Sequence, residues 1–430
     1  MVPTMRRFGR RGLLLAGLLA AGLPWMPAAQ AQDDFAAPGR HWVATWQGSP
    51  QTTDALFAGR IAPPPAYADQ TLREVVFTSI GGPQIRLRLA NTFGTQPLVV
   101  GAVHVARAAE GSAIVPATDR AVTFGGQGGI TVPPGGLALS DPVDMALPAL
   151  SNLAVSIYVP QDTGSATQHT LGRQTSYVAG GDATGAAAFP DGAETITTRP
   201  FLSNVEVLGV RQAGAVVTFG DSITDGFAST VDANLRWPDQ LARRLVRQYG
   251  NRVGVSNAGI SGNRVLNDAI GPNALARLDR DVLSQAGARY VTVLEGINDI
   301  GFSVAAAPGQ EVGADRIIAG QRQVIARARE LGLKVYGATL TPFQGAGYYS
   351  AAGEAKRQEV NAFIRDGGEF DAVIDFDRAV RDPQNPSAIA ADYDSGDHLH
   401  PNDAGYAAMA AAIDLSLFDP AALASRQAAE

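Results

Sequence analysis

The sequence predicts an all-β sandwich followed by an α/β region built on a parallel sheet. From about Gln212, apolar strand-like runs alternate with amphipathic helical segments. Such alternation, with strands that are apolar throughout, is typical of a parallel sheet covered by helices on both faces. Between residues 40 and 208, short β-rich runs are separated by Gly/Pro turns. That pattern favours an antiparallel sandwich.

The elements of the α/β region can be placed in order along the chain. The strand candidates are Ala215–Phe219, Val253–Asn257, Tyr290–Leu294, Lys334–Leu340 and Ala372–Phe376. The helix candidates are Pro238–Tyr249, Asn273–Gln285, Ala314–Leu331 and Glu354–Arg365, with a last helix after Asn402. Pro238 suits a first helical turn, and Leu241 and Leu245 repeat at helical spacing.

The β region begins with two clear strand candidates, Leu72–Ser79 and Gln84–Asn91. The glycine-containing link Ile80–Pro83 between them predicts a hairpin. Further strands are expected at Pro97–Val105, Ala121–Phe124, Leu153–Val159 and Phe201–Val207. The glycine cluster at residues 125–129 lacks the Lys-Ser/Thr of a phosphate-binding loop and a following helix, so we interpret it as a turn.

Residues 1–31 predict an export signal. Four arginines precede the apolar run Leu13–Leu23, and Ala29-Gln30-Ala31 forms a small-x-small cleavage site. Arg10-Arg11 is also typical of a twin-arginine signal, so the export route stays open. A membrane anchor is the alternative, but the run is shorter than the roughly 20 residues of a membrane span. We expect a periplasmic or extracellular protein without stable membrane insertion, ending in a tail at residues 419–430.

Composition excludes several classes of function. The chain is 46% hydrophobic and 17% charged, as in a globular protein. Without cysteine there are no disulfides, thiolate metal sites or cysteine nucleophiles. Loss of the signal's four arginines changes the formal charge from −7 to −11. An acidic chain without a basic tract argues against nucleic acid as a partner.

The segment Gly220-Asp221-Ser222-Ile223 follows the first strand of the α/β region. Active sites of open parallel sheets lie at the carboxyl ends of the strands, which makes Ser222 a candidate nucleophile. The alternative is that Ser222 caps a helix N-terminus. The next two strands lead into residues 257–263 and 295–299, so these segments are expected on the same edge of the sheet.

A serine nucleophile needs a general base, usually a histidine held by a carboxylate. The histidines are His41, His104 and His169 in the β region and His398 and His400 near the end of the α/β region. His104 lies in an alternating strand, and we interpret it as structural. Asp397 precedes His400 by three residues, close enough to orient its ring. The alternative is a zinc site formed by both late histidines with Asp394 or Asp397.

Acyl transfer also requires hydrogen-bond donors for a developing oxyanion. Gly262 allows its backbone N–H to approach closely, and Asn298 carries a side-chain amide. Both lie on the expected catalytic edge. Each of them is also a common turn residue, which is the alternative interpretation.

Together these segments resemble the four blocks of the SGNH (GDSL-type) hydrolases. The matching segments are Gly220-Asp221-Ser222-Ile223, Gly262, Gly296-x-Asn298-Asp299 and Asp397-x-x-His400. The resemblance covers roughly residues 214–416 and is closest to the secreted arylesterase/acylhydrolase-like branch, which is similar in Arg236–Asp239 and Tyr393–Pro401. The nucleophile elbow of ordinary α/β-hydrolases, G-x-S-x-G, is not matched, because Thr224 occupies the position of its second glycine.

The resemblance implies a flavodoxin-like three-layer α/β/α hydrolase domain over residues 212–418, after a jelly-roll-like sandwich over residues 40–208. It implies that Ser222 is the nucleophile, His400 the base and Asp397 its orienting carboxylate. The oxyanion hole would combine the backbone N–H groups of Ser222 and Gly262 with the Asn298 amide. No metal or cofactor is implied.

The resemblance also implies an exported serine esterase. The favoured substrates are short acyl esters, acetyl above all, on small molecules or polysaccharides. One alternative is a lipase or lysophospholipase, with Gly301–Gly313, Phe343, Tyr348 and Tyr349 lining an acyl pocket. The other is a protein that mainly binds glycans. The oligomeric state stays open.

Overall fold

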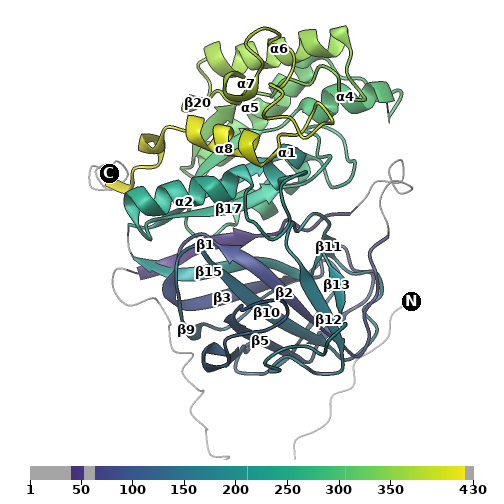
Figure 1. Cartoon of the computed structure of the whole chain (residues 1–430), viewed down its shortest axis with the longest axis vertical. Helices are drawn as coiled ribbons and strands as arrows, with labels where there is room; N and C mark the ends of the chain where they lie inside the picture. The colour runs from purple at the N-terminus through teal and green to yellow at the C-terminus, as the bar shows by residue number, and fades with distance from the viewer. Residues whose placement is uncertain (1–39, 53–62, 211, 306, 422–430) are drawn as a thin grey trace, which may run out of the picture.

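The computed structural model describes residues 40–52, 63–210, 212–305 and 307–421. Figure 1 shows a β-rich region packed end to end against an α/β region. The predicted export signal and the tail from residue 422 onward lie outside the described residues. Within the described ranges, no helix has the length and apolar character that a bilayer crossing requires.

The β region consists of two main antiparallel sheets that enclose one apolar core. The first sheet contains β1 (Arg40–Gln47), β3 (Gly82–Ala90), β8 (Leu137–Leu139), β9 (Val143–Leu147) and β15 (Leu202–Val210). The second contains β2 (Gln70–Thr78), β5 (Ala102–Arg107), β6 (Arg120–Ala121), β10 (Ser151–Val159), β12 (Ser176–Gly180) and β13 (Glu194–Ile196). Two short pairs join β4 (Leu98–Val100) to β7 (Ile130–Val132) and β11 (Gln168–His169) to β14 (Arg199–Pro200). The glycine cluster at 125–129 forms a turn, in which Phe124 and Gln127 exchange backbone hydrogen bonds.

The predicted hairpin at Ile80–Pro83 is wrong. β2 pairs with β10 and β12, whereas β3 pairs with β15, β8 and β9. The link therefore crosses from one sheet to the other. The alternating apolar side chains of both strands, such as Leu72 and Leu87, belong to one core. The two strands thus face each other across that core and do not share a ladder of hydrogen bonds.

The α/β region is a five-stranded parallel sheet in the order β17-β16-β18-β19-β20. Its strands are β16 (Gly214–Gly220), β17 (Val253–Gly259), β18 (Ala288–Leu294), β19 (Lys334–Ala338) and β20 (Ala372–Ile374). The five predicted strands are confirmed to within two residues at each end. Continuous apolar runs predict such strands well because both faces of the sheet are covered.

Two groups of helices cover this sheet (Figure 1). The helices are α1 (Ser222–Asp225), α2 (Trp237–Tyr249), α3 (Ala274–Leu278) with a π-helical continuation (Asp279–Leu283), α4 (Ile297–Ala305), α5 (Ala314–Glu330), α6 (Ala351–Asp366), α7 (Phe376–Val380) and α8 (Asp403–Ala412). Helix α8 packs against α2 and α7, while α5 packs against α3 and α6. The predicted fold class is confirmed, although α4 and α7 were not foreseen.

The order of the strands determines where a site can form. From β16 the chain continues to β17 on one side of the sheet and then returns to β18 on the other. This reversal is a topological switch point, where the loops after neighbouring strands separate and leave a crevice. Ser222 lies two residues beyond the end of β16, at that crevice.

The β region covers the edge strand β17 of the parallel sheet. Ser79 Oγ accepts a hydrogen bond of 2.9 Å from the backbone N–H of Val255. Gln47 accepts one of 2.7 Å from the Ser256 hydroxyl and donates another of 3.0 Å to the Asp281 carbonyl. An uncovered edge strand would expose unpaired backbone groups to other chains. The contact between the two regions therefore protects this edge.

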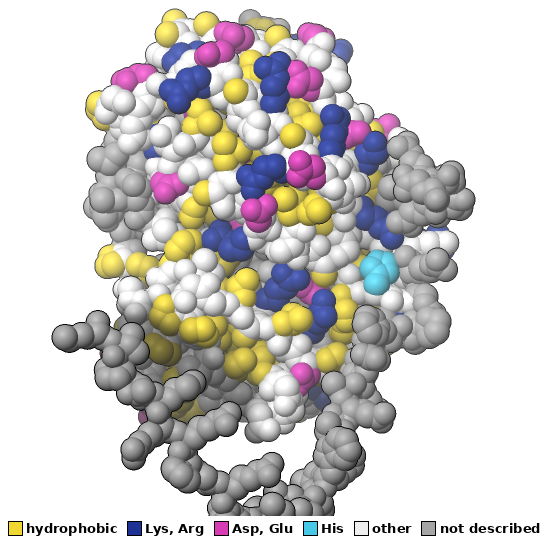
Figure 2. All heavy atoms as spheres, turned by 180° about the vertical axis from the view of Figure 1, so that it is seen from behind, with side chains coloured by type: hydrophobic (Ala, Val, Ile, Leu, Met, Phe, Trp, Pro, Cys, Tyr) yellow, Lys and Arg dark blue, Asp and Glu magenta, His cyan; other side chains and the backbone are white. Residues whose placement is uncertain are grey.

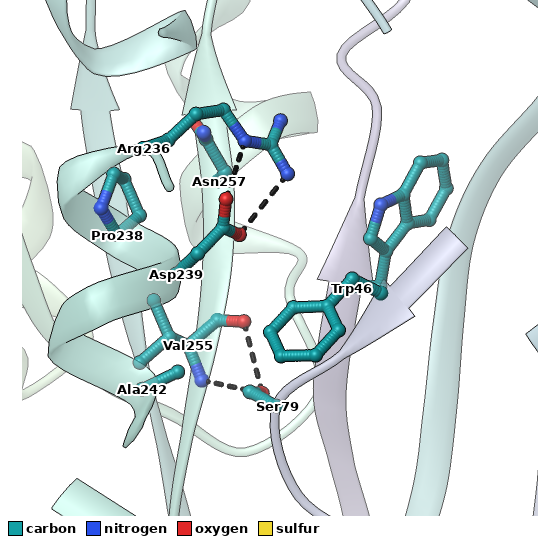
Figure 3. Close-up of a pocket in the computed structure, with 9 residues that line it drawn as sticks. Trp46, Ser79, Arg236, Pro238, Asp239, Ala242, Val255 and Asn257 are labelled. Carbon is teal, nitrogen blue, oxygen red and sulfur yellow. Dashed lines mark hydrogen bonds and ion pairs between the residues drawn. The ribbon is translucent and has the colours of Figure 1, made fainter. Parts of the chain in front are cut away.

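A small cavity lies between the two regions. Figure 3 shows Trp46 and Ser79 of the β region opposite Arg236, Asp239 and Val255 of the α/β region. The Arg236 guanidinium pairs with the Asp239 carboxylate at 2.8 and 3.1 Å. The cavity volume of about 10 Å³ is room for a single water molecule. This interface is thus closely packed.

The face of the molecule in Figure 2 carries acidic and basic side chains side by side. Neither sign of charge forms a continuous area on that face. A protein that binds a nucleic acid backbone usually gathers Lys and Arg on one surface. This face therefore offers no such surface.

Candidate active site

Ser222 is the first residue of α1, directly after the buried strand β16. The residue that caps this helix is Asp221, whose side chain accepts a hydrogen bond of 2.9 Å from Ile223 N. The interpretation of Ser222 as the cap is therefore wrong. Because Asp221 satisfies the free N–H, the Ser222 hydroxyl is available for another partner.

That partner is His400, in the loop before α8. Ser222 Oγ lies 2.7 Å from His400 Nε2. His400 Nδ1 lies 2.6 Å from the Asp397 carboxylate. Because a carboxylate only accepts, Nδ1 carries the proton and Nε2 can accept the serine proton. Ser222 and His400 are both buried, with exposed fractions of 6% and 8%.

The Asp397 carboxylate is held by several donors. One of its oxygens accepts the backbone N–H groups of Leu399 and His400 at 3.0 and 2.8 Å, and also the Ser395 hydroxyl. Partial burial raises the pKa of Asp397, but its hydrogen bond and attraction to His400, together with the backbone donors, lower that pKa well below its usual value. Asp397 is therefore charged at neutral pH and can hold the His400 ring in place through Nδ1.

The expected donors lie on loops at the same edge of the sheet. Gly262 follows β17 and has a φ of +74°. A Cβ at this position would lie 2.5 Å from the end of the Ile270 side chain, and the left-handed backbone conformation favours glycine. Within the described part of the chain, the backbone N–H groups of Ser222 and Gly262 make no hydrogen bond. Both can therefore donate to a bound group.

Asn298 lies in the first turn of α4, so its interpretation as a turn residue is wrong. Its Nδ2 donates to the Asn263 carbonyl at 3.0 Å, and its Oδ1 accepts from the Tyr348 hydroxyl at 3.2 Å. These two bonds determine the orientation of the amide and leave its second N–H available. The sequence suggests Tyr348 only as part of an acyl pocket, because nothing in the sequence relates it to Asn298.

The other histidines are separate from this chain of hydrogen bonds. His398 bonds to Asp394 at 2.6 Å, and its side chain is 55% exposed. The two late histidines therefore face different carboxylates. Among the described residues, no group of three His, Cys, Asp or Glu side chains could hold a metal ion. His104 pairs with Asp119 in the β region, and His41 bonds to the Ala213 carbonyl.

Arg277 lies beneath the site and was not foreseen. Its side chain, from α3, is fully buried and stacks on Phe219 with the guanidinium carbon 4.1 Å from the ring centre. Its N–H groups are donated to Gly220 O, Ala258 O, Asn263 Oδ1, Asp281 Oδ2 and Glu295 Oε1. The sequence holds one signal for a buried Arg277: with Asp281, it lies on the same helix face as the apolar residues Ala274 and Leu278. Both of these apolar residues are buried in the structure.

A second unforeseen contact reaches the site from the β region. His169 Nε2 lies 2.9 Å from Asp225 Oδ1, and both residues are buried. The other carboxylate oxygen of Asp225 accepts the backbone N–H and the hydroxyl of Ser261 at 2.9 and 2.8 Å. His169 belongs to a two-residue strand without periodicity, so the sequence carried no signal for this contact.

We predict that Arg277→Lys destabilises the protein by at least about 3 kcal/mol, because a lysine cannot satisfy five acceptors, three of which lie at the ends of three neighbouring strands. Chemical denaturation measures the change. Arg322→Lys is the control, since that side chain is 51% exposed and pairs with Glu369 at the surface. Equal stability of the two variants would show that Arg277 does not hold these strand ends together.

The buried carboxyl of Asp221 predicts a pH-dependent stability. Burial raises its pKa from 3.8 to about 7. The folded state then binds the proton more tightly than the unfolded chain, so this stabilisation is complete below pH 4 and is lost as the pH rises to about 7. The lowered pKa of Asp397 makes the stability fall as the pH decreases, but only below about pH 4.

We therefore expect the stability of Asp221→Asn, which keeps the capping oxygen, to decline less between pH 4 and 7 than that of the unchanged protein. Thermal unfolding of both proteins across this range measures the difference, and contributions of groups that do not interact with Asp221 cancel in the comparison. Parallel curves for the two proteins would contradict the raised pKa.

Part of the chain is similar to known proteins. Residues 218–408 match the model of the GDSL-like Lipase/Acylhydrolase family. A search of curated proteins finds no match. Similar solved structures include a GDSL-like lipase from Bacteroides thetaiotaomicron, with 20% identity, a TM-score of 0.37, and coverage of 49% of this chain and 90% of that one.

Two further solved structures are similar to just under half of the chain. An acetyl xylan esterase from Geobacillus stearothermophilus has 21% identity and a TM-score of 0.37, covering 47% of this chain and 94% of that one. The aryl esterase of M. smegmatis has 18% identity and a TM-score of 0.38, covering 46% and 96%. Residues 218–408 are thus similar to the GDSL-like Lipase/Acylhydrolase family, and on this match the protein is a carboxylic ester hydrolase.

Proposed function

We propose that the protein is an exported serine esterase that hydrolyses short-chain acyl esters, acetyl esters of carbohydrates above all, through an acyl-enzyme. The observation that carries this proposal is the unbroken chain of hydrogen bonds from Ser222 through His400 to Asp397, at 2.7 and 2.6 Å. A hydroxyl, an imidazole and a charged carboxylate in this order form the arrangement that activates a serine.

In the first half of the reaction, Ser222 Oγ attacks the ester carbonyl carbon while its proton passes to His400 Nε2. The carbonyl π electrons move to the oxygen, which becomes an oxyanion. When the tetrahedral intermediate collapses, the bond from carbon to the alcohol oxygen breaks, and His400 donates the proton to that oxygen. A water molecule then repeats these steps on the acyl-enzyme, releasing the carboxylic acid and restoring Ser222.

Three donors would stabilise the oxyanion. They are the backbone N–H groups of Ser222 and Gly262 and the remaining N–H of the Asn298 amide. The first two have no other partner within the described residues. The hydrogen bonds of Asn298 to Asn263 and Tyr348 hold the amide in one orientation. Donors fixed before the reaction cost no reorganisation when the charge develops.

The packing of aromatic side chains near Asn298 favours short acyl groups. The residues considered as walls of a long acyl pocket pack on one another, with ring centres of Phe343 at 6.1 Å from Tyr348 and 5.1 Å from Tyr349. Phe343 is fully buried in the core. Gly301 lies within α4, where a Cβ would meet the Tyr348 ring at 2.4 Å. These contacts leave little space for a long chain beside the amide.

The surface near His400, which would donate the proton to the leaving alcohol, is partly aromatic. The ring of Phe227, which is 41% exposed, lies 4.3 Å from the ring of His400, centre to centre. An exposed aromatic face beside the base suits the apolar face of a sugar ring or an aryl group. The proposal of export rests on the signal predicted in residues 1–31, which the structure does not describe.

We predict that Ser222→Ala removes nearly all turnover of p-nitrophenyl acetate, because no nucleophile remains. Asn298→Ala should lower kcat by roughly 10²- to 10³-fold through the loss of one oxyanion donor, with a smaller effect on KM. Steady-state kinetics measure both, and circular dichroism checks the fold. Near-normal turnover by Ser222→Ala would refute the assignment of the nucleophile.

A substrate panel tests the acyl and alcohol groups. On p-nitrophenyl esters from C2 to C16, we expect kcat/KM to be highest at C2 to C4, since the aromatic packing beside Asn298 limits the acyl chain. Acetylated xylan and acetylated pectin should release acetate. A maximum at long chains would favour a lipase, and stoichiometric glycan binding without turnover would favour a glycan-binding protein.

A further inference from the structure

We propose that His169, from the β region, is a positioning residue for the oxyanion hole and acts through Asp225. The β region is then part of the catalytic unit. This inference rests on the proposed function, because it concerns how the donors for that reaction are held. Figure 1 shows β11, which carries His169, at the end of the β region that faces the α/β region.

Each ring nitrogen of His169 lies within hydrogen-bond distance of an oxygen atom. Its Nδ1 lies 3.0 Å from the Ser49 carbonyl oxygen, and its Nε2 lies 2.9 Å from Asp225 Oδ1. Asp225 accepts two further hydrogen bonds from Ser261. Both ring nitrogens of His169 therefore face oxygen atoms, one in the β region and one in the α/β region. The contact joins the two regions through buried polar groups.

Asp225 connects the two backbone donors of the proposed oxyanion hole. It is the last residue of α1, whose first residue is Ser222. Its carboxylate also holds Ser261, the residue directly before Gly262. The two segments are in close contact, since a Cβ on Gly259 would lie 2.3 Å from Asp225 N. The orientation of this one carboxylate therefore influences the spacing of the Ser222 and Gly262 N–H groups.

A second link from the β region supports the same loop. Gln51 donates a hydrogen bond of 2.9 Å to the Ile270 carbonyl and accepts one of 3.1 Å from Thr170 N, the residue after His169. The Ile270 side chain packs over Gly262. Two contacts from the β region thus reach both sides of the loop that carries the Gly262 donor.

Two amide substitutions distinguish positioning from simple packing. In His169→Asn, the amide nitrogen replaces Nδ1 and can donate to Ser49 but does not reach Asp225. In His169→Gln, the amide nitrogen replaces Nε2 and can donate to Asp225 but not to Ser49. Both variants lose the ring and one hydrogen bond, so a purely structural role predicts similar kinetics for the two.

We expect His169→Asn to lower kcat for p-nitrophenyl acetate by roughly 10- to 100-fold, with KM within about threefold, since small displacements of reacting groups have effects of this size. His169→Gln should recover most of that loss. The Ki of trifluoroacetophenone, which forms an oxyanion adduct with the serine, should rise in His169→Asn by about the same factor as kcat/KM falls.

Two further variants complete the test. His104→Asn is the matched control, because His104 also pairs with a carboxylate in the β region but belongs to β5, away from the site. It should leave kcat and KM unchanged. If His169→Asn does not fold, Ser261→Ala removes one hydrogen bond to Asp225 from the other side, and it should lower kcat several-fold with little change in KM.

The outcomes separate the two proposals. If Ser222→Ala stays active in the same assay, the proposed function fails. If Ser222→Ala is inactive but the Asn and Gln variants of His169 have equal kcat and equal Ki for the ketone, the positioning role is overturned. An unchanged kcat in both His169→Asn and Ser261→Ala overturns it as well.

Discussion

The buried guanidinium of Arg277 holds together the edge of the sheet where the site lies. It donates to the carbonyl oxygen of Gly220 at the end of β16 and to that of Ala258 near the end of β17. It also donates to Glu295, directly after β18, and to Asn263, directly after Gly262. A planar group with five donors in fixed directions can join three strand ends at once. The positions of Ser222 and of the proposed oxyanion donors depend on this group.

The same edge of the sheet contains several buried carboxyl groups whose pKa values are raised. Burial raises the pKa of Asp221 to about 7 and that of Asp299 to about 6, and burial with the nearby Asp221 carboxyl raises the pKa of Glu295. One Glu295 oxygen has no hydrogen-bond partner within the described residues, which fits a protonated carboxyl. Asp397 is the opposite case, because His400 and backbone donors keep it ionised. Burial thus shifts the carboxyls below the serine toward their neutral form, whereas Asp397 beside the histidine stays charged.

The β region and the α/β region depend on each other at their contact. Strand β17 would lose two hydrogen-bond partners without Ser79 and Gln47, and the Asp225 carboxylate would lose one without His169. The first contact is general, since any closely packed neighbour with suitable hydrogen-bonding groups can cover an edge. The second is specific, since it joins one residue of the β region to the two segments that carry the backbone donors.

The sequence by itself determined the fold class, the five strands of the parallel sheet and the edge on which Ser222, Gly262, Asn298, Asp397 and His400 lie. It could do so because continuous apolar strands, helical periodicity and strand-end motifs are local patterns, and the carboxyl ends of parallel strands meet at one edge. Only the tertiary structure decided which strands β2 and β3 each pair with and that Asp221 caps α1. It also decided the contacts of Arg277, Tyr348 and His169. Each of these depends on which distant segment lies opposite, and His169 and Asp225 are 56 residues apart in the chain. Local propensity carries no information about such partners, because they are selected by the packing of the whole molecule.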